Sequence, residues 1–178
     1  MSHVSLGPEQ KSPEHLARQP FGQAPAIEED GLTLHESAIV LYIGEKCEAL
    51  LPKDRIGRER ATAWVFSALN TIERTVQELG SIIFFHKDAA WARERRPQVE
   101  QFLRQRLQQL ADALGDKDYL EGRFTVGDLM MADVLRIIEQ TGIINDYPTL
   151  IAYRQRCEPR PAFQRALADQ LEGFAGAP

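Results

Sequence analysis

The chain has 178 residues, a formal net charge of −5 and a sequence pI near 5.4, with 43% apolar and 26% charged residues. These ordinary globular values exclude a disordered or collagen-like chain. The acidic balance argues against binding to nucleic acid or to an anionic membrane, and no apolar run approaches the roughly 20 residues of a membrane-spanning helix. The first residues hold neither a basic start nor an apolar stretch, so we expect no secretory signal and a cytoplasmic protein.

Candidate metal ligands are scattered. Cys47 and Cys157 are far apart and fit no metal spacing, so we expect two unlinked, buried thiols in a reducing compartment. His15, His35 and His86 also lack ligand spacing, which favours surface or hydrogen-bonded histidines. We therefore expect no metal.

The first fifty residues are rich in proline and glycine, which predicts short elements joined by turns. Ala24 to Glu29 and Leu32 to His35 are expected to form strands. Between them, Asp30-Gly31 suits a type I′ hairpin, whose two central residues need positive φ. A weaker pattern predicts a strand over His3 to Leu6, and Ser12 with the following proline predicts a helical turn as far as Ala17.

Glu36 to Cys47 reads as a helix that is apolar on most sides, so we expect it to be buried on several of them. Pro52 and Gly57 then break the pattern. We predict one domain over residues 1–48, a linker over 49–57 and an all-helical domain over 58–178.

The remainder of the chain is helical by its apolar spacing. The first two helices carry their apolar residues three and four positions apart: Ala61, Trp64, Val65, Ala68, Leu69, Ile72, Val76 and Leu79, then Val99, Phe102, Leu103, Leu107, Leu110 and Leu114. Gly115 is expected to end the second. Further helices are predicted over residues 124–140, 151–157 and 161–171, followed by a tail over 173–178 that should fray.

Residues 124–129 form a capping box with a hydrophobic staple. Thr125 is expected to cap a helix, and Asp128, three residues on, can accept from the N–H of Thr125. Phe124 is expected to pack on Leu129. Asp133, inside the apolar stretch that follows, is expected to be a buried, hydrogen-bonded residue.

Several motifs together resemble the cytosolic glutathione transferase family. Residues 19–27 (QPFGQAPAI) are similar to its Asn-Pro-x-Gly-x-Val-Pro pattern, and residues 34–39 (LHESAI) to the Glu/Gln-Ser-x-x-Ile that opens a helix after the hairpin. Thr125-x-x-Asp128, Asp146-Tyr147-Pro148 and residues 160–163 (RPAF) match its helical domain. The resemblance implies α/β plus all-α architecture: a truncated thioredoxin-like domain followed by a helical bundle.

The same resemblance implies a site for glutathione as co-substrate. Family members have a cis bond before the proline matching Pro25, which turns the N–H and C=O of Ala24 toward the cysteinyl backbone. Ser37, at a helix start that favours an anion, would bind the γ-glutamyl carboxylate. Glu36 would bind the amino group, and Gln23 is a further contact. The plain alternative is that Ser37 is a helix cap and Glu36 a solvated charge.

The family's first strand, first helix and thiolate-stabilising Tyr, Ser or Cys have no counterpart here. Only 24 residues precede Pro25, whereas a strand-helix-strand unit needs roughly 30. The catalytic residue is therefore unknown, since Ser5 and Ser12 match by composition alone. We expect an uncovered sheet edge, which a partner chain or a rearranged N-terminus would have to cover.

Other candidates rest on the resemblance or on composition. Trp64, Phe66 and Asn70 are candidates for a pocket for a hydrophobic electrophile, although the spacing of Trp64, Phe66, Phe84, Phe85 and Trp91 favours the core. Phe21 lies where some classes insert an aromatic into a partner, so it is either a contact in an expected homodimer or locally packed. The arginines at 93, 95, 96, 104 and 106 favour a solvated helix face over a nucleic-acid site.

Family members conjugate glutathione thiolate to electrophiles. The chain as written is therefore either a glutathione transferase of low activity or a non-enzymatic binding or assembly module. A third reading is that a longer gene product supplies the residue that is missing here.

Overall fold

The computed structural model describes residues 8–175, and the chain divides into two compact units, Met1–Leu51 and Pro52–Pro178. The strand predicted over residues 3–6 lies outside the described residues. Helix α3 begins at Arg55, so the last three residues of the stretch predicted as linker are helical.

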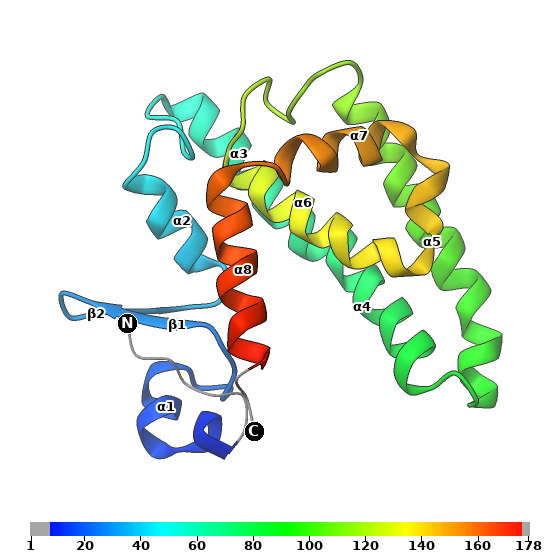
Figure 1. Ribbon diagram of the computed structural model, residues 1–178, viewed down its shortest axis with the longest axis horizontal. Helices are drawn as coiled ribbons and strands as arrows, with labels where there is room; N and C mark the ends of the chain where they lie inside the picture. The colour runs from blue at the N-terminus through cyan, green and yellow to red at the C-terminus, as the bar shows by residue number, and fades with distance from the viewer. Residues whose placement is uncertain (1–7, 176–178) are drawn as a thin grey trace. The chain divides into compact units, whose positions relative to one another are not determined.

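The first unit is built around a short hairpin. Its elements are η1 (Pro8–Lys11), α1 (Pro13–Arg18), β1 (Ala26–Glu29), β2 (Leu32–His35) and α2 (Ala38–Glu45), as Figure 1 shows. The strands pair antiparallel with Ala26 opposite His35. Asp30 and Gly31 have φ values of 51° and 80°, which confirms the predicted turn with two positive φ angles. Ser12 caps α1, as predicted, by accepting from the N–H of His15.

Helix α2 departs from the sequence expectation. It begins at Ala38 because Glu36 adopts a left-handed φ of 58°, which a helix does not admit. Ile39 is buried but Ile43 is 50% exposed, so the prediction of burial on several sides is wrong. Helix α2 packs on β2, and of its eight residues Ile39 and Gly44 are the buried ones.

The two thiols are unlinked, but their environments differ. Cys157 is buried, as expected, and burial raises the pKa of its thiol to about 12. Cys47 is exposed, so its predicted burial is wrong. The reason is local, because Cys47 lies beyond the end of α2 and outside any helix or strand.

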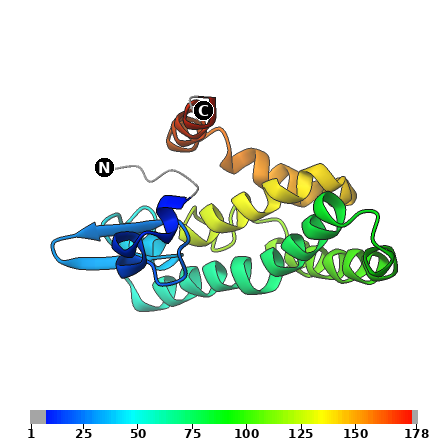
Figure 2. The ribbon, with the colours of Figure 1, turned by 90° about the horizontal axis from the view of Figure 1, so that it is seen from below.

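In the second unit, all the regular elements of the described residues are helices. A continuous run leads through α3 (Arg55–Ser67), the π-helical η2 (Ala68–Glu73), α4 (Arg74–Gly80) and the π-helical η3 (Ser81–Phe85), as Figure 2 shows. The others are α5 (Ala90–Leu114), α6 (Val126–Ile138), η4 (Glu139–Thr141), η5 (Ile143–Asp146), α7 (Pro148–Cys157) and α8 (Pro161–Ala175). Since α8 continues to Ala175, residues 173–175 of the predicted fraying tail are helical, and residues 176–178 lie outside the description.

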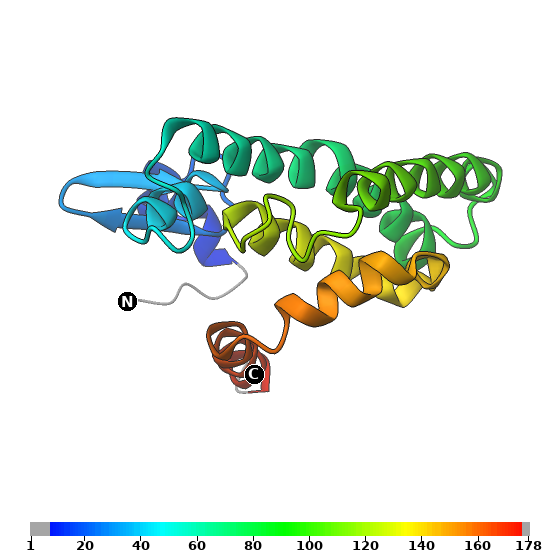
Figure 3. The same ribbon diagram turned by 90° about the horizontal axis from the view of Figure 1, so that it is seen from above.

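The predicted apolar faces meet in one core. Val76, Leu103 and Leu135, from α4, α5 and α6, are at most 3% exposed. Helix α6 lies along α3 and η2 (Figure 3). Gly127 permits this approach, because a Cβ there would come within 2.5 Å of the Trp64 Cβ.

Several aromatic residues expected in the core are exposed instead. Trp64 packs partly buried against the core, but four others are 53–80% exposed: Phe66, Phe84, Phe85 and Trp91. A π-helical segment has more residues per turn than an α-helix, so it shifts the apolar face. This shift accounts for the exposure of Phe84 and Phe85 in η3, whereas Ala68 and Ile72 in η2 are buried as predicted. Phe66 and Trp91 lie on α3 and α5, and their predicted place in the core is wrong without a π-helical turn.

The capping box is confirmed. Asp128 Oδ2 accepts from the backbone N–H of Thr125 at 2.8 Å, and Thr125 Oγ1 accepts from the N–H of Gly127 at 3.2 Å. Phe124 packs edge to face against Tyr119, while Leu129 is 40% exposed, so the staple contact stays a prediction.

Asp133 is exposed and pairs with Arg136 at 3.2 Å, so its predicted burial is wrong. Five positions separate it from Asp128, which is more than one helical turn, and this brings it to the solvent side of α6.

Within residues 8–175, no helix is both long and apolar enough to cross a membrane. The same residues bring together no group of three or more His, Cys, Asp and Glu side chains suited to a metal ion.

Candidate functional site

The five residues predicted to bind glutathione lie at one end of the hairpin. Gln23, Ala24 and Pro25 precede β1, and Glu36 and Ser37 follow β2. Since Ala26 pairs with His35, the two loops are neighbours, and the N–H of Glu36 donates to the carbonyl of Pro25 at 3.4 Å. The Ala24–Pro25 peptide bond is cis, as the resemblance implied.

Ser37 stands at the start of α2, where the first N–H groups of a helix favour an anion. Its hydroxyl makes no capping hydrogen bond, although Ser37 occupies the cap position. The side chain is half-buried rather than fully solvated. The hydroxyl therefore remains available to an external acceptor, and the reading of Ser37 as a simple helix cap loses its main support.

The backbone of Ala24 offers a second binding surface. Among the described residues, neither its N–H nor its C=O bonds to another backbone group. Ala24 is exposed and lies two residues before Ala26, the first residue of β1 that pairs with β2. An extended ligand backbone can pair with such groups as an added strand does.

Gln19 joins the two loops, and sequence reasoning missed its role. Its side chain is fully buried. The amide oxygen accepts from the N–H groups of Phe21 at 2.7 Å and of Gln23 at 3.1 Å. The amide nitrogen donates to Glu36 Oε1 at 3.3 Å. One amide thus fixes the loop before β1 and orients the carboxylate after β2.

The sequence did offer a signal for Gln19. It precedes Pro20 in the motif of residues 19–27, at the position where the glutathione transferase family has Asn.

Lys11 of η1 and His15 of α1 also hold the loop that precedes β1. Lys11 Nζ donates to the carbonyls of Phe21 at 3.2 Å and Gly22 at 3.1 Å. The buried His15 places Nε2 2.6 Å from the carbonyl of Gln23. These contacts confirm the expectation of a hydrogen-bonded histidine for His15 and leave the Gln23 side chain exposed.

Three residues were predicted to line a pocket for the electrophile: Trp64, Phe66 and Asn70. Among the described residues, the structure does not bring them to one cavity. The indole N–H of Trp64 donates to Glu121 Oε1 at 2.8 Å, Phe66 is 53% exposed, and Asn70 lines a separate cavity with Arg74. Their role in electrophile binding stays a prediction.

Phe21, the predicted dimer contact, is 67% exposed. It meets the His35 ring edge-on, with 6.4 Å between the ring centroids. Local packing and a partner contact both remain open for this side chain.

Two family models match the chain. Residues 2–45 match the N-terminal domain of glutathione S-transferase, and residues 74–170 match a C-terminal domain of glutathione S-transferase. Together they cover both units, so the first unit is thioredoxin-like and the second is the family's helical domain.

Curated relatives agree with these models. Glutathione S-transferase F11 of Arabidopsis thaliana is 32% identical over 93% of this chain and 83% of its own length. Glutathione S-transferase 1 of Schizosaccharomyces pombe is 27% identical over 93% of this chain and 82% of its own. A crystal structure of a Burkholderia graminis glutathione transferase, with two glutathione molecules bound per subunit, superposes with a TM-score of 0.81 at 26% identity, covering 89% of this chain and 72% of that one. The chain belongs to the glutathione S-transferase family.

Proposed function

We propose that this chain binds glutathione at the loops that flank its hairpin. Ser37 and the start of α2 hold the γ-glutamyl carboxylate, Glu36 holds the amino group, and the backbone of Ala24 pairs with the cysteinyl residue. The observation that carries the proposal is the uncommitted hydroxyl of Ser37, beside a carboxylate that Gln19 orients. The glutathione bound to the Burkholderia graminis relative supports it.

The family reaction is attack of the glutathione thiolate on a hydrophobic electrophile. We propose that the chain as written performs it slowly, because no residue of its sequence matches the family's thiolate-stabilising Tyr, Ser or Cys. A thiol with an unshifted pKa of about 8.5 is only a few per cent thiolate at neutral pH. The same lack favours the second candidate, a glutathione-binding or assembly module without turnover. In either case we propose a cytoplasmic homodimer in which Phe21 contacts the partner.

Two measurements on one preparation test the two parts of this proposal. Retention on immobilised glutathione tests binding, and turnover of chlorodinitrobenzene tests conjugation. We expect the chain to be retained and to elute with free glutathione. We expect turnover close to the uncatalysed rate, rising about tenfold for each pH unit below the thiol pKa because the thiolate fraction does so. Failure of retention would refute the glutathione site. Rapid turnover with a flat profile above pH 6 would show that the chain does stabilise the thiolate.

A further inference from the structure

Three large aromatic side chains are exposed where the helical unit turns from η3 into α5. Phe84 and Phe85 are the last residues of η3, and Trp91 lies in the first turn of α5. Their exposed fractions are 56%, 80% and 53%. Figure 1 shows this connection at one end of the second unit. We call residues 84–91 the aromatic tip, and none of them belongs to the proposed glutathione site.

The backbone of the aromatic tip is fixed by its own contacts. The N–H of His86 donates to the carbonyl of Ser81 at 3.1 Å, and the His86 ring packs on Trp91 with 5.2 Å between the ring centroids. Ile82 and Ala92, which flank the tip in the chain, are 2% and 0% exposed and anchor it in the core. Because the tip is already ordered, little conformational entropy is lost when its rings bind something.

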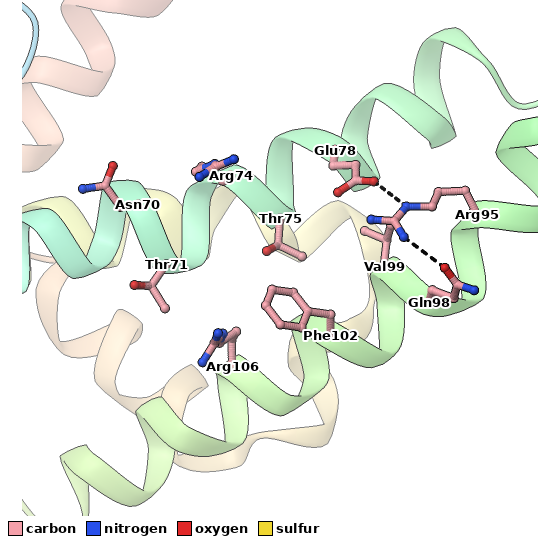
Figure 4. A pocket seen from close by; sticks show the side chains of 10 residues that line it. All are labelled: Asn70, Thr71, Arg74, Thr75, Glu78, Arg95, Gln98, Val99, Phe102 and Arg106. Atoms are coloured by element: carbon pink, nitrogen blue, oxygen red, sulfur yellow. Dashed lines mark hydrogen bonds and ion pairs between the residues drawn. The ribbon is translucent and has the colours of Figure 1, made fainter.

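The charges around the rings cancel. Residues 84–94 carry two cations and two anions: Lys87, Arg93, Asp88 and Glu94. Within residues 8–175, none of these four forms an ion pair. The next arginine, Arg95, is committed to Glu78, whose Oε1 accepts from the Arg95 Nε at 2.8 Å (Figure 4). The tip is therefore neutral as a whole and offers free charges of both signs, on a chain with a formal net charge of −5.

The exposed rings present too small an area for a stable protein partner. Aromatic side chains bury about 150–250 Å² each, so at the observed exposures the three rings present roughly 300–450 Å². A specific protein interface takes about 800 Å² from each partner. A lipid bilayer needs no such area of complementary shape, because its headgroups rearrange around an inserted ring. Aromatic side chains also concentrate at the interface between membrane and water.

We propose that the aromatic tip anchors the chain on the surface of a zwitterionic phospholipid bilayer, with the rings of Phe84, Phe85 and Trp91 inserted among the headgroups. A zwitterionic headgroup carries one phosphate and one ammonium group. The free cations of the tip complement the phosphate, and its free carboxylates complement the ammonium. An anionic bilayer offers no advantage, because it repels the acidic chain. The anchor operates whether or not the chain binds glutathione.

Co-sedimentation of the full chain with phosphatidylcholine vesicles tests the proposal. We expect a partition constant of at least about 10³ M⁻¹, which approaches that of a single myristoyl chain. Phe85→Ala and Trp91→Ala should each weaken partitioning at least about fivefold, because inserted apolar area is lost. Ile56→Ala, at an apolar residue of α3 that is 67% exposed, is the matched control and should partition as the wild type does. Replacing about a third of the lipid by phosphatidylglycerol should not strengthen binding, because the tip is neutral.

Tryptophan fluorescence gives a second readout on the same samples. Vesicles should shift the emission of the wild type to shorter wavelength, because Trp91 leaves water, whereas Trp64 already packs against the core. Trp91→Phe keeps a ring at the tip, so it should still bind but lose the shift.

Four results would overturn the proposal. Two concern binding itself: no co-sedimentation at about 10 mM lipid, or binding that neither Phe85→Ala nor Trp91→Ala weakens. The third is binding of the wild type without a shift in emission, because another surface would then contact the lipid. The last is a change in oligomeric state in either alanine variant, seen by size-exclusion chromatography, because the tip would then be an interface between copies.

Discussion

Asp128→Asn lowers the free energy of unfolding of the helical unit by about 3 kcal/mol, because four donors converge on this one carboxylate. Asp128 is fully buried. Oδ1 accepts from the N–H of Leu120 at 2.9 Å and from the Tyr153 hydroxyl at 3.0 Å. Oδ2 accepts from the N–H of Thr125 at 2.8 Å and from its hydroxyl at 3.0 Å. The carboxylate thus ties the loop before α6, the start of α6 and α7 together.

An asparagine has the same shape but one of its two groups donates. Its amide nitrogen would face donors on whichever side it lies, so at least one buried N–H or hydroxyl loses its acceptor. Tyr153 does not compensate as an anion, because burial, the larger of the causes that raise the pKa of its phenol in the wild type, persists in the variant. The loss therefore includes the desolvation of unpaired groups as well as the missing bonds.

Urea unfolding followed by circular dichroism measures the effect, with Asp133→Asn as the control. Asp133 is exposed on the same helix and pairs only with Arg136 among the described residues, so its variant should stay within about 0.5 kcal/mol of the wild type. Thr125→Ala, which removes the cap but leaves the carboxylate, should cost about 1 kcal/mol. Equal stability of the Asp128 and Asp133 variants would contradict this role of Asp128.

Gln19→Leu weakens glutathione binding at least about tenfold, on the proposal that glutathione occupies the hairpin loops. Leucine fills a similar volume but leaves the N–H groups of Phe21 and Gln23 without their acceptor and frees the Glu36 carboxylate. Both loops that contact the ligand would then lose their fixed geometry, and ordering them on binding would reduce affinity.

Calorimetry with glutathione on three variants separates positioning from general damage. Gln19→Asn keeps the amide and should recover part of the affinity, whereas Gln101→Leu, at an exposed position of α5, should bind like the wild type. The circular dichroism spectrum should be unchanged in all three, since none of the substitutions introduces a helix-breaking residue or changes a residue of the helical core. If Gln19→Leu is folded and binds glutathione with wild-type affinity, Gln19 does not position the site.

Local patterns with a direct physical cause were the most predictable from the sequence. The Asp30-Gly31 turn follows from the need for two positive φ angles, and the Thr125–Asp128 box follows from the free N–H groups of a helix start. The loops proposed to bind glutathione could be placed next to each other because their residues flank a hairpin whose register the turn fixes.

Features that depend on tertiary packing were not predictable in the same way. Asp128 and Asp133 lie on one apolar helix, and only its packing against α3 and α7 decides that the first is buried and the second exposed. The π-helical turns moved Phe84 and Phe85 out of the expected core face. Gln19 and Glu36 come together from separate elements, so no short spacing marks their contact.

A calorimetric titration of the full chain with glutathione, wild type beside Ser37→Ala, tests the central claim most directly. The wild type should bind with a dissociation constant below about 1 mM, and removal of the Ser37 hydroxyl should weaken binding about tenfold because a charged carboxylate loses a donor. Ser67→Ala, whose hydroxyl bonds only its own helix at the Ala63 carbonyl, is the control and should bind as the wild type does. Binding weaker than millimolar, unchanged by Ser37→Ala, would contradict the glutathione site in this chain.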